Sequence, residues 1–209
     1  MERVLIVGAA GTTGHKIVNL IKASSHFEPI AMIRDEKQQE AFKAQGIETV
    51  LADLEQDVTH TVKHVDKVIF AAGSGGKKVK AVDQEGAKKM ISASEQAHVK
   101  KFIMLSSMGA DRPEQSEQLQ DYLKAKHNAD TFLKASKLNY TIIRPGTLNN
   151  DKGKGRIQWA KSLSKSGEIT RDDVAQALVH ALHDDIANTA TFEILQGETP
   201  IEEALRAVE

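Results

Sequence analysis

The sequence of 209 residues contains no cysteine, and this absence excludes several kinds of site. Without thiols the chain cannot use a cysteine nucleophile, bind zinc through cysteine or hold an iron–sulfur cluster. Aromatic residues make up only 4% of the chain, which argues against a surface that stacks nucleic-acid bases. The 28 basic and 29 acidic residues give a formal charge of −1, so no basic field favours nucleic acid as a partner either.

Long hydrophobic runs are also missing from the sequence. No segment approaches the roughly 20 apolar residues of a membrane span. The N-terminus lacks the basic flank and long apolar core of a secretory signal. We therefore expect a cytoplasmic protein that binds no membrane. The length is typical of one domain, so we predict a single domain over 1–209, and nothing in the sequence defines an oligomeric state.

The most informative stretch lies near the N-terminus, where a short apolar run ends at a set of evenly spaced glycines. The run has the length and composition of a buried parallel strand, and hydrophobic residues with helical spacing follow the glycines. In a dinucleotide-binding turn, Gly8 permits the turn, Gly11 leaves room for a pyrophosphate and Gly14 lets the helix pack closely. We assign Thr12 and Thr13 to the same site, because N–H groups of a first helical turn point at the phosphates. A glycine-rich turn without a ligand is the alternative.

The end of the second predicted strand, 29–33, bears on which dinucleotide would bind. Sites for NAD usually place an acidic residue there, whereas an arginine accommodates the 2′-phosphate of NADP. Arg34 occupies this position, with Lys37 as a second contact, and we therefore expect NADP(H) rather than NAD. If the register is one residue later, Asp35 faces the ribose and the preference weakens.

Other strand ends predict the rest of the same crevice, because the carboxyl ends of parallel strands share one edge of a sheet. The third strand, 46–51, leads to Asp53 and Leu54, which we expect beside the adenine; Asp53 is also suited to cap a following helix. Small residues after the fourth strand allow the backbone to approach the nicotinamide half closely, and the sixth strand ends near the nicotinamide amide. The residues assigned to these two strand ends are Ala71, Ala72, Gly73, Pro145, Gly146 and Thr147.

Candidate chemical groups follow the fifth predicted strand, 101–107, which ends in Ser106 and Ser107. Tyr122 and Lys126 stand four residues apart on a predicted helix and so share one face. An ammonium beside a phenol stabilises the phenolate, which suits the tyrosine to proton transfer. We predict Tyr122 as general acid and base, Lys126 as the group that tunes it and holds the nicotinamide ribose, and Ser107 as a hydrogen-bond donor to a substrate carbonyl. Ser106 is expected at the cofactor, and a packing role is the alternative for Tyr122.

The chain from 147 to 209 predicts a small substrate-side region. Its segment 149–167 is rich in glycine, asparagine, serine and lysine, and we expect a loop that covers the substrate. Thr199 is expected to begin a short terminal helix. Earlier in the chain, His60 and His64 share a predicted helix, but no third ligand lies nearby, so we expect no metal site.

Taken in order, these landmarks resemble those of atypical short-chain dehydrogenases/reductases of the NAD(P)-binding, NmrA-like group, which is related to epimerase/dehydratase-like proteins. The matching stretches are Gly8-x-x-Gly11-x-x-Gly14, Arg34, Asp53-Leu54, Ala71-Ala72-Gly73, Ser106-Ser107, Tyr122-x-x-x-Lys126, the run from Thr141 to Gly146, and Arg171-Asp172-Asp173-Val174-Ala175. The resemblance covers essentially the whole chain and implies a doubly wound α/β Rossmann domain with a mainly parallel sheet that binds NADP. The C-terminal region is much shorter than in extended epimerases, which puts a nucleotide-sugar substrate in doubt.

The resemblance and the candidate residues together predict an NADP-dependent oxidoreductase. It would move a hydride between nicotinamide and a small carbonyl-type substrate. One alternative is a non-catalytic module that senses NADP(H) and controls a protein partner, since several members of the group bind the cofactor without catalysis. A flavin or biliverdin-type reductase, in which Tyr122 is dispensable, is another.

Overall fold

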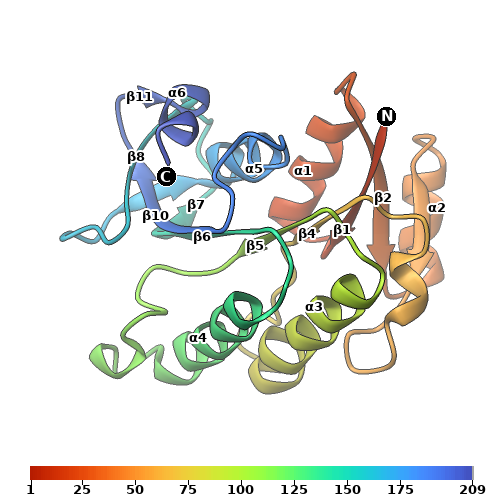
Figure 1. The fold of residues 1–209 in the computed structure, drawn as a ribbon, viewed down its shortest axis with the longest axis horizontal. Coiled ribbons are helices and arrows are strands. Elements are labelled where there is room, and N and C mark those ends of the chain that lie inside the picture. The colour runs from red at the N-terminus through yellow and green to blue at the C-terminus, as the bar shows by residue number, and fades with distance from the viewer. Residues whose placement is uncertain (209) are drawn as a thin grey trace.

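The computed structural model describes residues 1–208, and its main element is a sheet of nine strands (Figure 1). The strands are β1 (Glu2–Val7), β2 (Phe27–Ile33), β3 (Glu48–Leu51), β4 (Lys67–Phe70), β5 (Lys101–Leu105), β6 (Tyr140–Pro145), β8 (Arg156–Ala160), β10 (Ala190–Gln196) and β11 (Thr199–Pro200), with β7 (Thr147–Asn149) and β9 (Glu168–Thr170) forming a separate parallel pair. The order in the sheet is β11-β8-β10-β6-β5-β4-β1-β2-β3. All neighbours from β10 to β3 are parallel, and β8 runs antiparallel to β10 and β11. The strand order reverses between β1 and β4, where doubly wound sheets bind ligands at their carboxyl ends.

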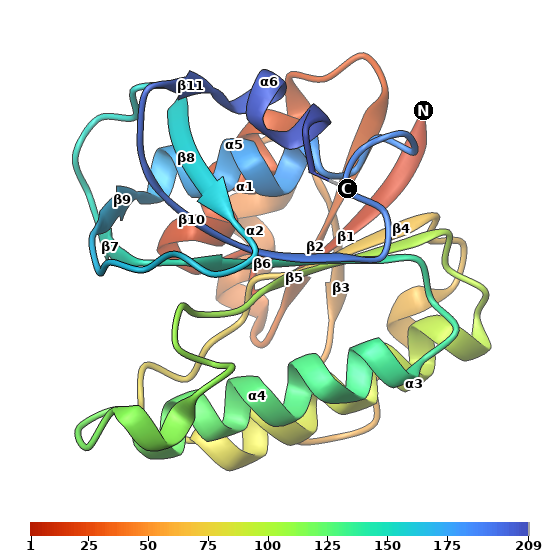
Figure 2. The same ribbon diagram turned by 60° about the vertical axis from the view of Figure 1, so that its left-hand side comes forward.

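Helices cover both faces of this sheet. They are α1 (Thr12–Lys22), α2 (Glu36–Lys43), a π-helix (Val79–Gly86) that continues into α3 (Ala87–Gln96), α4 (Gln120–Ala135), α5 (Arg171–His180) and α6 (Ile201–Arg206). Figure 2 shows α3 and α4 below the sheet, with α1 and α5 above it. The predicted doubly wound α/β fold with a mainly parallel sheet is confirmed.

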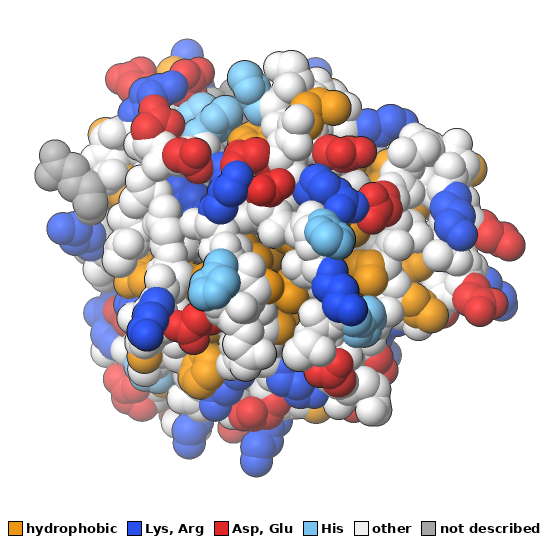
Figure 3. All heavy atoms as spheres, turned by 45° about the vertical axis from the view of Figure 1, so that its right-hand side comes forward, with side chains coloured by type: hydrophobic (Ala, Val, Ile, Leu, Met, Phe, Trp, Pro, Cys, Tyr) orange, Lys and Arg blue, Asp and Glu red, His pale blue; other side chains and the backbone are white. Residues whose placement is uncertain are grey.

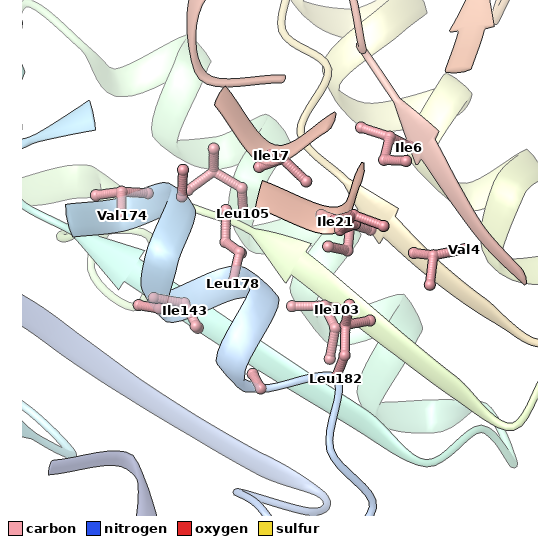
Figure 4. Packing of buried hydrophobic residues seen from close by; sticks show 14 of the residues in the cluster. Val4, Ile6, Ile17, Ile21, Ile103, Leu105, Ile143, Val174, Leu178 and Leu182 are labelled. Carbon is pink, nitrogen blue, oxygen red and sulfur yellow. The ribbon is translucent and has the colours of Figure 1, made fainter. Parts of the chain in front are cut away.

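The two faces of the sheet bury separate hydrophobic clusters, because strand side chains alternate between them. Along β1, Val4 and Ile6 pack under α1 and α5, whereas Leu5 and Val7 pack under α3 and α4. Figure 4 shows how residues of α1, α5, β5 and β6 meet in the first cluster: Ile17, Ile21, Ile103, Leu105, Ile143, Val174 and Leu178. Each fully buried aliphatic side chain contributes roughly 1.5–3 kcal/mol. A strand apolar on both faces is therefore what holds the glycine turn in place.

The surface carries charges of both signs in close proximity. On the face drawn in Figure 3, basic and acidic side chains alternate over the surface without a large region of one sign, as the net charge near zero suggests. Within residues 1–208, no helix combines the length and the hydrophobicity needed to cross a membrane.

The helix predicted to carry His60 and His64 does not form. The structure has only one 3-10 turn there (Thr59–Val62), and His64 lies beyond it with a left-handed φ of 57°. Asp57 accepts hydrogen bonds from the backbone N–H and the hydroxyl of Thr59, and such local bonds compete with helix formation. The two histidines therefore share no helix face.

The segment 149–167 is more ordered than its composition predicts. It contains β8, in which Ile157 is buried and Trp159 packs edge-on against Phe192 of β10, with ring centroids 6.0 Å apart. The alternation of apolar and polar residues was the missed signal, masked by the surrounding glycines and lysines. Thr199 does not begin a helix. It lies in β11, where it pairs with Ile157 of β8, and α6 follows β11.

Three imidazole rings are close together at the amino end of the sheet. The ring centroids of His26 and His183 are 5.7 Å apart, and those of His183 and His180 are 5.5 Å apart. Burial lowers the pKa of His180 and of His183 below 6.5, and the neighbouring imidazole of each adds to this effect. Protonation of either ring therefore opposes folding.

Acidification should weaken the fold through these histidines. Because they bind protons less readily in the folded protein than in the unfolded chain, the free energy of unfolding should fall as the pH drops below about 6.5. Urea unfolding between about pH 7.5 and 5.5, above the range in which most carboxylates titrate, measures this slope. The variant His183→Gln should flatten it, whereas His98→Gln, at an exposed position, should not. An unchanged slope in His183→Gln would contradict the assignment.

Candidate functional site

The glycine turn packs tightly on the protein side and is open on the other. Gly8 has a φ of 91°, and a Cβ there would lie 2.7 Å from Cα of Ala72. A Cβ on Gly14 would lie 2.0 Å from the carbonyl oxygen of Gly8, so α1 rests directly on the turn. A Cβ on Gly11 would have one close neighbour, that same oxygen at 3.2 Å. The predicted roles of the glycines, close packing and open space, correspond to this geometry.

The first turn of α1 has unused hydrogen-bond donors. Its N-cap is Gly11, which has no side chain to cap the helix, and the first N–H groups of any helix have no partner within it. Thr12 is exposed and Thr13 is buried. The turn therefore presents N–H groups beside open space, an arrangement suited to a phosphate.

Two glycine variants should separate packing from binding. Gly14→Ala forces a methyl group against a backbone oxygen that cannot move freely and should lower the free energy of unfolding by about 3 kcal/mol or more. Gly11→Ala should change it by less than about 1 kcal/mol, yet weaken dinucleotide binding by obstructing the phosphate. Thermal unfolding and cofactor titration of both proteins test this. Equal stability of the two variants would contradict the close approach of Gly14 to the Gly8 carbonyl oxygen.

The end of β2 presents a free cation. Arg34 is exposed and forms no ion pair within residues 1–208. Asp35 is engaged elsewhere, because its carboxylate accepts a hydrogen bond of 2.9 Å from the backbone N–H of Gln38 and caps α2. Lys37 is exposed in the first turn of that helix. Arg34 thus follows directly after β2, and Asp35 is the N-cap of α2.

The loops after β3 and β4 form the neighbouring part of the crevice edge. Asp53 is half-buried and accepts a bond of 2.9 Å from the N–H of Glu55, so it caps a turn and not a helix. Leu54 is buried against Gly86. The three small residues after β4 are half-buried or exposed: Ala71, Ala72 and Gly73. Small side chains keep this stretch accessible, as the sequence suggests.

The end of β6 is less available than predicted. The N–H of Gly146 donates to the carbonyl of Ile194 at 3.1 Å, and the N–H of Thr147 donates to that of Gly167 at 2.9 Å. Pro145 has no N–H. The carbonyl oxygen of Pro145 accepts the N–H of Met108 at 2.9 Å. The exposed side chain of Thr147 can still contact a nicotinamide amide.

The structure brings Tyr122 and Lys126 together at the carboxyl end of β5. Lys126 is 3% exposed, and its Nζ lies 5.7 Å from the centroid of the Tyr122 ring. The same Nζ donates to the carbonyl of Leu105, the last residue of β5, at 3.2 Å. Ser107, two residues farther on, is half-buried, and its hydroxyl donates to the carbonyl of Met108. A phenol, an ammonium and a hydroxyl therefore border the same strand end.

Ser106 points elsewhere. Its hydroxyl donates to the carboxylate of Asp130 at 2.9 Å, and Arg144 donates to the same oxygen from β6. Burial raises the pKa of Asp130. This network joins β5, α4 and β6, and it holds the helix that carries Tyr122. The hydroxyl hydrogen of Ser106 is thus used within the protein.

Asp83 is a site residue that the sequence did not reveal. It lies in the π-helix, is 1% exposed, and its Oδ2 accepts a bond of 3.1 Å from the N–H of Ser74. Its Oδ1 is 3.8 Å from Nζ of Lys126 and has no hydrogen-bond partner within residues 1–208. A carboxylate on the buried face of a predicted helix was the available signal. Single π-helical turns occur frequently at functional sites.

The comparisons with known proteins agree with this geometry. The sequence matches the model of a family described as NAD(P)H-binding over residues 8–185. The chain belongs to the NAD(P)H-binding family. The predicted membership of the atypical, NmrA-like short-chain dehydrogenases/reductases is confirmed.

Proteins similar to this chain match it over nearly its whole length. The "Uncharacterized sugar epimerase YhfK" of Bacillus subtilis (strain 168) is 41% identical over 212 residues, which are 98% of this chain and 99% of that protein. The solved structure named "Putative NAD-dependent epimerase/dehydratase from Bacillus halodurans" has a TM-score of 0.92 at 37% identity and covers 98% of this chain and 99% of its own. That of the oxidoreductase ylbE from Lactococcus lactis has a TM-score of 0.87 at 29% identity, with 98% and 95% covered.

Several residues of this NAD(P)H-binding protein fit a dinucleotide at the carboxyl edge of the sheet. Gly11 leaves space beside the free N–H groups of α1, where the pyrophosphate would be held. The free guanidinium of Arg34 lies at the end of β2, where the adenosine half would bind. Lys126 lies at the end of β5, where the nicotinamide half would bind.

Proposed function

We propose that the protein is an NADP(H)-dependent oxidoreductase that acts on a small carbonyl-type substrate. The observation that carries the proposal is the buried ammonium of Lys126 beside the Tyr122 ring, at the end of β5. Membership of the family implies that a dinucleotide binds. Tyr122 and Lys126 add a group that can transfer a proton next to this dinucleotide. When bound, the reduced cofactor would supply the hydride that adds to the carbonyl carbon.

The chain's own residues manage the proton and the orientation. The Tyr122 hydroxyl donates its proton to the substrate oxygen as negative charge develops there. The nearby ammonium of Lys126 stabilises the phenolate that remains, and a buried site strengthens this interaction. Ser107 donates a hydrogen bond to the same substrate oxygen and fixes the carbonyl.

The choice of NADP(H) over NAD(H) rests on Arg34. A guanidinium that forms no ion pair within residues 1–208, next to the end of β2, suits a 2′-phosphate through charge-assisted hydrogen bonds. An NAD site would place a carboxylate there for the ribose hydroxyls, and the nearest one, Asp35, caps α2.

Net consumption of the cofactor distinguishes this function from two others. An epimerase, as two of the relatives are named, returns the hydride to its substrate and consumes no cofactor, and a sensor module transfers none. The test is a binding titration with NADPH, NADH, NADP⁺ and NAD⁺, followed by NADPH oxidation with a panel of aldehydes, ketones and flavins. Tight NADPH binding with turnover of a carbonyl compound supports the proposal. Binding without turnover on any substrate would contradict it.

A further inference from the structure

The side chains of Asp83 and Lys126 form a buried pair near the carboxyl end of β5. Asp83 comes from the π-helix after β4, and Lys126 comes from α4 after β5. Their side chains are 1% and 4% exposed, and the closest distance between Nζ and Oδ1 is 3.8 Å. The carboxylate thus enters from a second helix to compensate an ammonium that the proposed reaction uses.

The Oδ1 atom of Asp83, which has no hydrogen-bond partner within residues 1–208, lies next to the loop after β4. A Cβ on Gly73, which is exposed at the end of β4, would lie 3.4 Å from this Oδ1. Oδ2 is held by the N–H of Ser74, so the carboxylate is fixed in orientation. The carboxylate thus lies next to the exposed backbone of Gly73, at the edge of the sheet where the nicotinamide half would lie.

We propose that Asp83 sets the preference of the site between the oxidised and the reduced cofactor. The oxidised nicotinamide ring carries a positive charge and the reduced ring carries none. With both partners charged, the field of Lys126 at the ring is largely cancelled by that of Asp83. Without Asp83, the ammonium of Lys126 repels the oxidised ring, which is positively charged, but not the neutral reduced ring. This inference rests on the proposed function, because it requires the nicotinamide half to lie near Lys126.

The expected change is large because the surroundings are buried. Two unit charges about 8 Å apart, in a medium with an effective dielectric constant of about 20, interact strongly enough to change a binding constant by roughly tenfold or more. The ratio of dissociation constants for NADP⁺ and NADPH should therefore rise by about tenfold or more in Asp83→Asn. Lys126→Met removes the opposite charge and should lower the same ratio.

The experiment is a calorimetric titration of each full-length protein with NADP⁺ and with NADPH at the same pH and ionic strength. Asp83→Asn is nearly isosteric, and its amide oxygen can still accept the bond from Ser74. Asp111→Asn is the matched control, because Asp111 pairs with Arg112 and Arg144, and its ratio should stay that of the wild type. If Asp83 has a purely structural role, Asp83→Asn should weaken the binding of NADP⁺ and of NADPH equally and leave the ratio of their dissociation constants unchanged.

The outcomes separate this inference from the proposed function. An unchanged ratio in Asp83→Asn, with tight binding retained in the wild type, would overturn the inference and leave the proposed function standing. A wild type that binds neither form would overturn both. If thermal unfolding shows that Asp83→Asn does not fold, Lys126→Met decides alone, since a ratio that does not fall would overturn the inference.

Discussion

Replacing Tyr122 by phenylalanine is expected to lower kcat for carbonyl reduction by about 10²- to 10⁴-fold, which is the usual contribution of a positioned acid or base. The ring should keep its place beside Lys126, because its contact with Nζ does not depend on the hydroxyl. Affinity for NADPH should therefore stay close to that of the wild type. Steady-state kinetics on the best substrate of the panel, together with an NADPH titration, measure both quantities.

The chain offers a matched control for this variant. Its only other tyrosine, Tyr140, is 9% exposed in β6 and belongs to the cluster under α3 and α4. Burial raises the pKa of Tyr140, which makes it a poor proton donor at neutral pH. Tyr140→Phe should leave turnover unchanged. Full turnover in Tyr122→Phe would remove the tyrosine from the mechanism, and turnover of flavin alone would favour a flavin reductase.

The glycine turn could be predicted from the sequence. Gly8, Gly11 and Gly14 act through the absence of a side chain, and the apolar strand before them has a pattern visible in any buried parallel strand. Because such strands end at one edge of the sheet, the positions of Arg34 and Tyr122 along the crevice followed from their order in the chain. The register at Arg34 stayed open, since the competing Asp35 needed a visible cap to be assigned.

The part of the site made by side chains from distant segments could not be predicted. Ser106 looks like a cofactor ligand until Asp130, 24 residues farther along the chain, is seen to accept its hydroxyl. Asp83 lies on the buried face of a predicted helix, but its partner is not apparent until Lys126 is seen beside it. In both cases the deciding neighbour comes from α4, whose position over the sheet depends on packing and not on local sequence. Tertiary contacts of this kind leave no periodic signal.

Replacing Arg34 by glutamate is expected to raise the dissociation constant for NADPH by roughly 100-fold, because charge-assisted hydrogen bonds contribute about 1.5–3 kcal/mol and repulsion of the 2′-phosphate adds to their loss. NADH lacks that phosphate, so its binding should weaken little, and a glutamate at this strand end can accept hydrogen bonds from its ribose hydroxyls. The preference should therefore move toward NADH. Stability should change little, since Arg34 is exposed and forms no ion pair within residues 1–208.

The control for Arg34→Glu must make the same change of charge on nearby structure. Lys43→Glu does so in the last turn of α2, at an exposed position away from the strand end, and should leave both affinities close to those of the wild type. Raising the salt concentration should weaken NADPH binding to the wild type more than to Arg34→Glu, because screening acts on the attraction that the variant has lost. Equal losses of NADPH and NADH in Arg34→Glu would mean that the guanidinium does not contact the 2′-phosphate, and the preference for NADP(H) would then lack its physical basis.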